Sequence, residues 1–191
     1  MAAQARDDRI GRERDRHLAQ TRGYRFVAGR GAKPSATETP APLRYWQYDV
    51  PGRTAVLFVV VVVGLWLGLF GWVDGWAGLR GEAPLALGCG LVVLALSVSR
   101  FTVSDHGLSI DVAASRTSAG TVVPLMLVRD VRLGDAPAEW PKPARQGGRW
   151  PGRVRVAVRH RDADGQGEKA FTHWVRDPEA FATALGQRLS R

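Results

Sequence analysis

Two long apolar runs dominate the pattern of hydrophobic and polar positions along the chain. Residues 55–73 (AVLFVVVVVGLWLGLFGWV) and 83–99 (APLALGCGLVVLALSVS) contain no charged side chain. As helices that rise about 1.5 Å per residue, they would each reach roughly 26–28 Å, close to the hydrocarbon thickness of a bilayer. We therefore predict two transmembrane helices, joined as a hairpin by the short glycine-rich segment between them.

Basic residues are distributed unevenly around these two runs. Residues 1–53 hold eleven Lys and Arg against six Asp and Glu, and residues 100–191 hold fifteen against ten. The linker between the runs holds a single arginine against two acidic residues. Because basic flanks stay on the cytoplasmic side, we expect a plasma-membrane protein with both termini in the cytoplasm.

The segment before the first apolar run divides into two parts. Residues 1–43 are rich in Arg, Asp, Gly, Ala and Thr with little apolar periodicity, which predicts a basic disordered segment. A membrane-lying helix around residues 10–18 is the alternative, with Ile10, His17 and Leu18 on its apolar face. The aromatic residues of 44–48 (RYWQY) are typical of the membrane interface, so we assign residues 44–99 to the membrane segment.

Glycines recur at small-xxx-small spacing in the first predicted helix and just past its end. They are Gly64, Gly68, Gly71 and Gly75. Such spacing favours the close approach of a second helix in lipid. The approaching helix is the second one of the same chain, or else it belongs to a homodimer or a partner subunit. Neither helix contains an ionisable residue other than Cys89, which argues against a channel or transporter.

Beyond the second apolar run the hydrophobic period changes from helical to two. The alternation predicts strands at 101–103, 108–112, 121–124, 125–133, 153–160 and 168–175. Asp177 and Pro178 have the residue types of a helix cap and a first helical position. Phe181, Leu185 and Leu189 then form one apolar stripe. Residues 100–191 are therefore predicted to be an α+β domain, an antiparallel sheet closed by a C-terminal helix.

Three stretches carry a resemblance to a known family: SRFTVSDHGLSI, VVPLMLVRDVRL and WVRDPEAFATAL. The domain resembles the bacterial pleckstrin-homology-like (PH-like) domain. Over roughly residues 45–191 the chain is similar to small actinobacterial membrane proteins with a two-helix anchor followed by such a domain. That family is mostly of unknown function, so the resemblance implies a fold and a location but no activity. The insert at 134–152 and the basic N-terminal extension depart from the family pattern.

The sequence offers no constellation for catalysis, metal binding or cofactor binding. One cysteine excludes a disulfide framework and a zinc site built on cysteine pairs. The four histidines lack metal-ligand spacing, and no nucleophile or phosphate loop has a recognisable setting. We therefore expect a protein that is not an enzyme.

Residues 134–152 (GDAPAEWPKPARQGGRWPG) form the stretch with the most functional character. Prolines keep such a loop extended, and tryptophan with arginine suits a headgroup layer or an acidic protein surface. The candidate contact residues are Trp140, Lys142, Arg145, Arg149, Trp150 and Arg153. An ordinary loop that covers the edge of the sheet is the alternative reading, and the arginine face of strand 153–159 is read as either functional or simply solvated.

These observations predict a scaffold or accessory subunit that binds anionic lipid or an acidic partner protein at the cytoplasmic face. The formal net charge of +9 keeps a second hypothesis open, a membrane-anchored nucleic-acid-binding protein. The chain has no recognisable DNA-binding motif, and aromatics interleave with basic residues only in the 134–152 loop.

Overall fold

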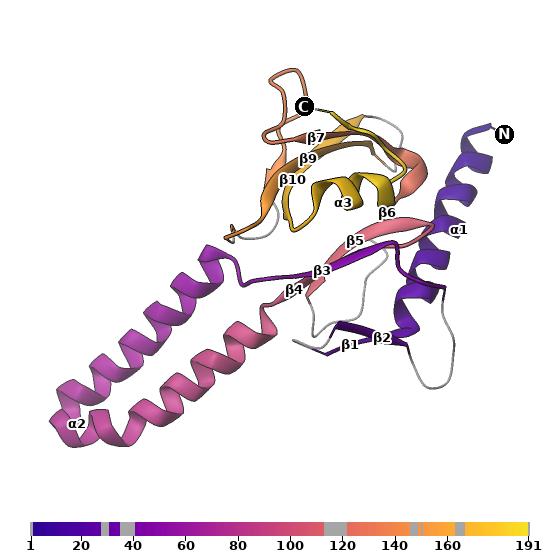
Figure 1. Cartoon of the computed structure of the whole chain (residues 1–191). Coiled ribbons are helices and arrows are strands. Elements are labelled where there is room, and N and C mark those ends of the chain that lie inside the picture. The colour runs from indigo at the N-terminus through magenta and orange to yellow at the C-terminus, as the bar shows by residue number, and fades with distance from the viewer. Residues whose placement is uncertain are drawn as a thin grey trace.

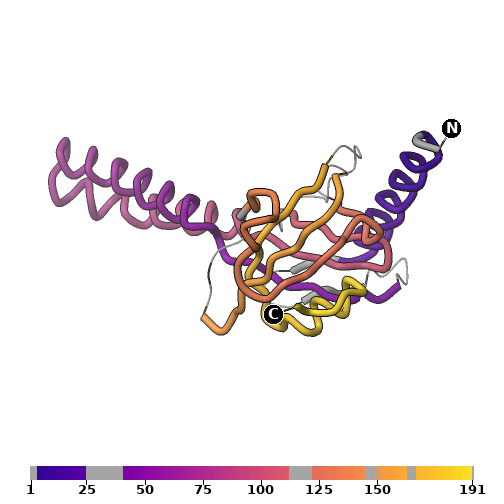
Figure 2. The backbone as a smooth tube through the Cα atoms, turned by 90° about the horizontal axis from the view of Figure 1, so that it is seen from above, coloured from indigo at the N-terminus to yellow at the C-terminus, as the bar shows by residue number. Residues whose placement is uncertain are grey.

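A computed structural model describes residues 2–27, 31–34, 41–112, 122–145, 149, 151–162 and 167–190. These residues combine α-helices with antiparallel and mixed sheets, an α+β architecture with one long apolar helix (Figure 1). The helices are α1 (Ala2–Arg22), α2 (Arg53–Leu96) and α3 (Pro178–Ala184), with a 3-10 turn η2 at Leu125–Leu127. Figure 2 shows α2 projecting from one side of the molecule and α1 lying at the other.

Within the described residues, the strands form a four-stranded sheet, a five-stranded sheet and a small two-stranded sheet. The four-stranded sheet is antiparallel, in the order β3 (Tyr45–Asp49), β4 (Ser99–Val103), β5 (Gly107–Val112) and β6 (Val122–Pro124). The five-stranded sheet has the order β11 (Leu189–Ser190), β7 (Val128–Leu133), β9 (Val154–Arg161), β10 (Glu168–Val175) and β8 (Ala144–Arg145). Strands β1 (Tyr24–Val27) and β2 (Gly31–Pro34) pair with each other.

The predicted alternation of the domain is confirmed in its central strands. Phe101, Val103 and Leu108 from the first sheet and Val156 and Val158 from the second are all at most 2 % exposed. They belong to one core cluster that also contains residues of α3. The strand pairs β4–β5 and β9–β10 are antiparallel hairpins, as the turn residues indicate.

The C-terminal helix begins where its sequence predicts and ends earlier. Asp177 caps it, since its side chain accepts from the backbone N–H groups of Glu179 (3.1 Å) and Ala180 (2.9 Å). Gly186, with φ 68°, ends the helix in the left-handed conformation that favours glycine. Leu189 is therefore not on the helical stripe; it pairs with Val131 of β7 as part of β11.

The aromatic segment before α2 is a strand of the folded domain. Strand β3 pairs antiparallel with β4, from Tyr45 opposite Val103 to Asp49 opposite Ser99. The ring of Tyr45 packs edge-on against Phe181, with centroids 5.5 Å apart. The assignment of this segment to the membrane is therefore corrected for β3, which is hydrogen-bonded into the sheet. Tryptophan and tyrosine are common both in strands and at a membrane interface. The partner strand β4 follows α2 in the sequence, so no local pattern indicated the pairing.

The expectation of disorder in residues 1–43 is wrong for Ala2–Arg22. That segment is helix α1, which lies against β5 and β6 (Figure 1). Ile10 is 3 %, His17 0 % and Leu18 7 % exposed. The alternative prediction, a helix lying on the membrane, placed these three side chains against lipid. In the structure they are buried in the protein instead. Residues 28–30 and 35–40 lie outside the described residues.

Helix α2 consists of two arms that meet at Gly75. That residue has φ 60° and ψ −142°, outside the helical region, and Figure 1 shows the arms side by side. The arms approach closely at Gly90, where an added Cβ would lie 3.1 Å from Val59 and from Val63. Among the described residues, α2 is the one helix long and apolar enough to cross a membrane, judged by length and composition. Its mean hydropathy reaches 2.6, and 6 % of that window is buried.

Candidate functional site

The outer face of the five-stranded sheet carries the segment 134–152, which first runs away from the start of β9. Asp135 forms an ion pair with Arg155 near that start. The ring of Trp140 lies under the guanidinium of Arg159, at 5.2 Å from its carbon. Arg155 and Arg159 are four residues apart on one strand, a distance of about 13 Å. The chain therefore advances along β9 between Asp135 and Trp140.

The second half of the same segment returns toward the start of β9. Strand β8 pairs in parallel with Phe171 and Thr172 in the middle of β10. Further on, the guanidinium of Arg149 lies 5.8 Å from the ring of Trp174, which is opposite Arg155 in the β9–β10 register. The described part of the segment thus runs out along β9 and returns at the β10 edge of the sheet, and we call it the flap.

This path separates the six residues that the sequence groups into one contact site. Trp140 is at the far end of the flap, and Lys142 is two residues further along the chain and exposed. Arg145 is in β8, while Arg149 and Arg153 are at the near end, beside the start of β9. Trp150 lies outside the described residues. The structure therefore presents two surfaces, a distal one and one next to α2.

Arg153 lies inside the protein and not on the flap's surface. Its side chain is 8 % exposed and forms an ion pair with the carboxylate of Asp49, which is 1 % exposed. Its second terminal nitrogen donates to the carbonyl oxygen of Tyr48. Arg153 therefore connects the start of β9 to the end of β3. Asp49 is 104 residues away in sequence, so spacing gave no sign of this pair.

The Asp49–Arg153 pair is part of a buried polar cluster, which we call the Asp49 cluster: Gln47, Asp49, Arg153 and His173. Gln47 Nε2 donates to Asp49 Oδ1 at 2.9 Å, and His173 Nε2 lies 3.0 Å from Asp49 Oδ2. His173 is fully buried, and its ring stacks on Phe101 at 4.6 Å between centroids. Charges buried this deeply require partners. The cluster holds β3, β9 and β10 together beside α2.

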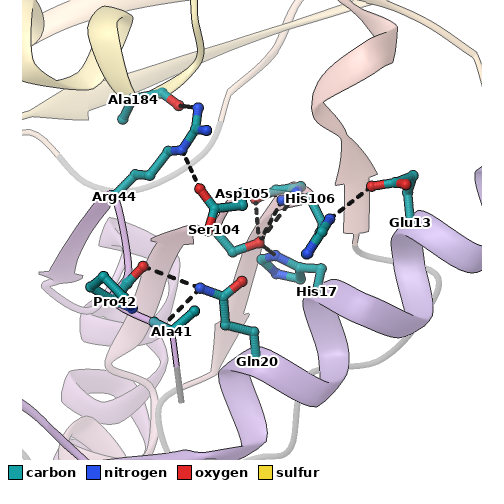
Figure 3. A network of polar contacts seen from close by, with 11 residues as sticks. Glu13, His17, Gln20, Ala41, Pro42, Arg44, Ser104, Asp105, His106 and Ala184 are labelled. Atoms are coloured by element: carbon teal, nitrogen blue, oxygen red, sulfur yellow. Dashed lines mark hydrogen bonds and ion pairs between the residues drawn. The ribbon is translucent and has the colours of Figure 1, made fainter. Parts of the chain in front are cut away.

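A second buried polar cluster attaches α1 to the first sheet (Figure 3). We call it the His17 cluster: His17, Thr102, Ser104 and Ser109. His17 Nδ1 lies 2.7 Å from Ser104 Oγ, and His17 Nε2 lies 2.9 Å from Ser109 Oγ. Burial lowers the pKa of His17 from 6.5 to about 4, so the ring is neutral at neutral pH. At the rim, His106 Nδ1 lies 2.9 Å from a carboxylate oxygen of Glu13.

The outward arginines of β9 have partners on the sheet. Arg159 pairs with Asp130 and lies 3.4 Å from a carboxylate oxygen of Glu168. The hydrogen bond to Asp130 raises the pKa of Arg159. Arg155 lies over the ring of Trp174 at 5.0 Å, in addition to its pair with Asp135. The reading of this face as simply solvated is therefore replaced by a cation–π and ion-pair surface.

The predicted glycine stripe is divided in the structure. A Cβ at Gly64 or Gly68 would meet no described atom within 4 Å, whereas one at Gly71 would meet Leu79 at 3.1 Å. Gly75 is the break between the arms. Contact between the arms therefore uses Gly71 and Gly90, and the faces at Gly64 and Gly68 are open.

The described residues contain no group of three or more His, Cys, Asp or Glu side chains placed to hold a metal ion. No family model, curated protein or solved structure matches the chain. The functional argument therefore rests on the residues themselves.

Proposed function

We propose that this chain is a non-enzymatic integral membrane protein whose helix α2 crosses the plasma membrane twice, as a hairpin. The support is the apolar surface of the two arms. Leu57, Leu65, Trp72 and Leu91 are all more than 60 % exposed. An apolar surface of this extent supports contact with lipid, because soluble proteins rarely expose such large patches.

One observation carries the proposed topology: α2 is inserted between two paired strands. Three residues separate the end of β3 from α2, and two separate α2 from β4. Asp49 and Ser99 are directly opposite each other in the antiparallel pair. A chain that leaves and re-enters the domain at one point crosses the membrane an even number of times. Together with the excess of basic residues on both flanks, this supports a cytoplasmic domain and cytoplasmic termini.

The domain itself is proposed to be PH-like. A four-stranded antiparallel sheet is followed by the three antiparallel strands β7, β9 and β10 and then by α3. Phe181 and Leu185 of α3 join the core between the sheets. In this arrangement the membrane hairpin replaces the turn between the first two strands of the domain, which suits a scaffold or accessory subunit held tightly at the surface.

The distal end of the flap is the proposed contact for an acidic partner protein. Lys142 is exposed, and among the described ion pairs it has no carboxylate partner. Trp140 is half-buried beside it and gives an aromatic anchor. The near end of the flap has a different environment, because Arg149 there lies over Trp174 of β10.

Cysteine labelling tests the topology. In a Cys89→Ser background we introduce Gly81→Cys, at an exposed position near the turn of α2 with no atom within 4 Å of an added Cβ. Thr183→Cys, exposed on α3, is the matched domain position. In right-side-out membranes, a membrane-impermeant maleimide labels the Gly81→Cys variant at once. It labels the Thr183→Cys variant only after permeabilisation. Equal labelling of both in sealed membranes contradicts the proposal.

Crosslinked affinity purification from native membranes tests the accessory role. We expect a complex of defined stoichiometry from the unmodified chain, and its loss in the Trp140→Ala/Lys142→Glu variant. Arg188→Glu, an exposed change in the C-terminal segment, is the matched charge control. Recovery of the same complex from both variants contradicts a partner site at the distal end of the flap.

A further inference from the structure

The surface around the base of α2 is chemically distinct from the distal end of the flap. We call it the root surface: Arg53, Arg149, Pro151, Gly152 and Val154. All five are exposed, and Val154 is 41 % exposed although it is an aliphatic residue in a strand. The surface therefore combines two arginines with apolar and small groups.

Covalent geometry sets the distance of this surface from the bilayer. Arg53 is the first residue of α2 and follows Asp49 by four positions. Four residue steps span at most about 14 Å. If α2 is inserted in the membrane, the end of β3 is held within that distance of its first turn, at the depth of the lipid headgroups.

The buried Arg153 holds the rest of the root surface at the same height. Its guanidinium binds Asp49 and the Tyr48 carbonyl, the last residues of β3. Its neighbour Val154 is fixed in the sheet opposite Val175. Pro151 and Gly152 directly precede Arg153 in the chain and are thereby kept near the end of β3. Arg149 lies over Trp174, which is opposite Arg155 in the β9–β10 register.

The electrostatics at this end leave the exposed arginines available to an anion. The carboxylate of Asp49 is buried and paired internally, and Asp135 is paired with Arg155. Among the described ion pairs none includes Arg53 or Arg149. Asp177, two residues after the end of β10, accepts hydrogen bonds from backbone N–H groups as the cap of α3.

We propose that the root surface binds the phosphate groups of anionic phospholipid, through Arg53 and Arg149. Val154 and Pro151 contact the apolar edge of the headgroup layer, and Arg153 is the positioning residue that keeps Arg149 at this height. A guanidinium forms paired hydrogen bonds to phosphate and tolerates partial desolvation. The inference rests on the proposed insertion of α2 and assigns the lipid contact to the near end of the flap.

A depth-quenching experiment on the full-length protein tests the assignment. The Cys89→Ser/Pro151→Cys protein carries an environment-sensitive fluorophore and is reconstituted in nanodiscs of phosphatidylcholine with increasing brominated phosphatidylglycerol. We expect quenching to saturate at a low fraction of the anionic lipid. Each of the single variants Arg53→Gln and Arg149→Gln raises the half-saturating fraction of anionic lipid about fivefold. That is the effect of removing one basic residue at a membrane surface. Arg188→Gln, at an exposed position in the C-terminal segment, leaves the curve unchanged.

The controls separate lipid, phosphate and insertion. We expect free glycerol phosphate at millimolar concentration to leave the quenching curve unchanged, because the site binds lipid at a membrane surface. A shift of the curve would mean that a soluble phosphate is the ligand and would overturn the lipid assignment. Arg153→Ala abolishes the preference for anionic lipid, and Arg153→Lys restores part of it. Curves that are the same for the parent protein and the two glutamine variants overturn the root-surface proposal alone. A protein that fails to enter nanodiscs contradicts the insertion of α2 instead.

Discussion

Two buried histidines lie on opposite faces of the four-stranded sheet, and they are stabilised in opposite ways. His173 stacks on Phe101 of β4, while His17 shares Ser109 with Thr102, the next residue of that strand. His17 is fully buried between the hydroxyl groups of Ser104 and Ser109. His173 is equally buried, yet it lies 3.0 Å from the carboxylate of Asp49, which also pairs with Arg153. The His17 cluster is built from neutral groups, while the Asp49 cluster contains the buried ion pair of Asp49 and Arg153.

The difference matters because the two clusters hold different parts of the molecule. The His17 cluster attaches α1, which otherwise buries few apolar side chains on the sheet. The Asp49 cluster joins β3, β9 and β10 beside the base of α2. A neutral cluster loses its stability when acid charges the ring, and a buried ion pair loses it when one partner is removed. We infer that the attachment of α1 to the sheet varies with pH, whereas the contacts at the base of α2 are rigid.

The largest expected effect comes from removing the carboxylate of the Asp49 cluster. Asp49→Ala leaves the buried guanidinium of Arg153 without its counter-ion, and we expect a loss of about 3–5 kcal/mol in the free energy of unfolding. Chemical denaturation of the full-length protein in detergent micelles, followed by near-UV circular dichroism, measures it.

The exposed pair of Asp135 and Arg155, two residues along the chain from Arg153, provides the control for Asp49→Ala. Asp135 is 76 % exposed and pairs with Arg155, whose side chain is 29 % exposed. Asp135→Ala should cost about 0–1 kcal/mol, as exposed pairs do. The double variant Asp49→Leu/Arg153→Met should recover part of the loss of Asp49→Ala, since no charge is left buried alone. Equal losses for Asp49→Ala and Asp135→Ala would contradict the contrast between buried and exposed pairs.

The second expected effect is a dependence on pH confined to α1. The pKa of His17 falls from 6.5 to about 4 on folding because burial disfavours the imidazolium. Above pH 6.5 the ring is neutral in both states, so the attachment is at full strength. As pH falls from 6.5 toward 4, protons bind the undocked ring preferentially, and the attachment weakens by about 2 kcal/mol at pH 5.

Hydrogen exchange of the α1 amides between pH 7 and pH 5, corrected for the intrinsic rate, measures this weakening. His17→Gln, which cannot be protonated, should make α1 less protected at pH 7 and remove the pH dependence. The amides of β9 serve as an internal control and should show no comparable change. Protection of α1 that stays constant over this range would contradict the role of His17.

These two clusters also mark what the sequence could and could not predict. Period-two alternation and the Asp177 cap are local signals, and they predicted β4, β5, β9, β10 and the start of α3. The early end of α3 was equally local, since Gly186 is the residue type that terminates a helix. By contrast, His17 meets hydroxyl groups 87 and 92 residues away, and no pattern within α1 indicates them.

The candidate site shows the same division between local and long-range information. The exposure of Lys142 and Arg149 follows from the polar, proline-rich character of the flap. The separation of Trp140 from Arg149 depends on which strand positions the flap contacts, and it required the structure. Arg153 alternates in sequence with valines, which suggested a solvent-facing side chain. Its side chain is instead buried in an ion pair with Asp49, which precedes α2 in the sequence.

The smallest expected effect tests whether His17 alone carries the attachment of α1. Glu13 contacts His106 at the rim of the same interface, and their side chains are 22 % and 30 % exposed. Water screens a pair at this depth, so Glu13→Ala should reduce the protection of α1 by about 0.5 kcal/mol or less at pH 7. Hydrogen exchange under the same conditions as for His17→Gln measures it. A loss from Glu13→Ala as large as that from His17→Gln would mean that charge at the rim, and not the neutral buried cluster, holds α1. The proposed contrast between the two buried clusters would then fail for the one that attaches α1.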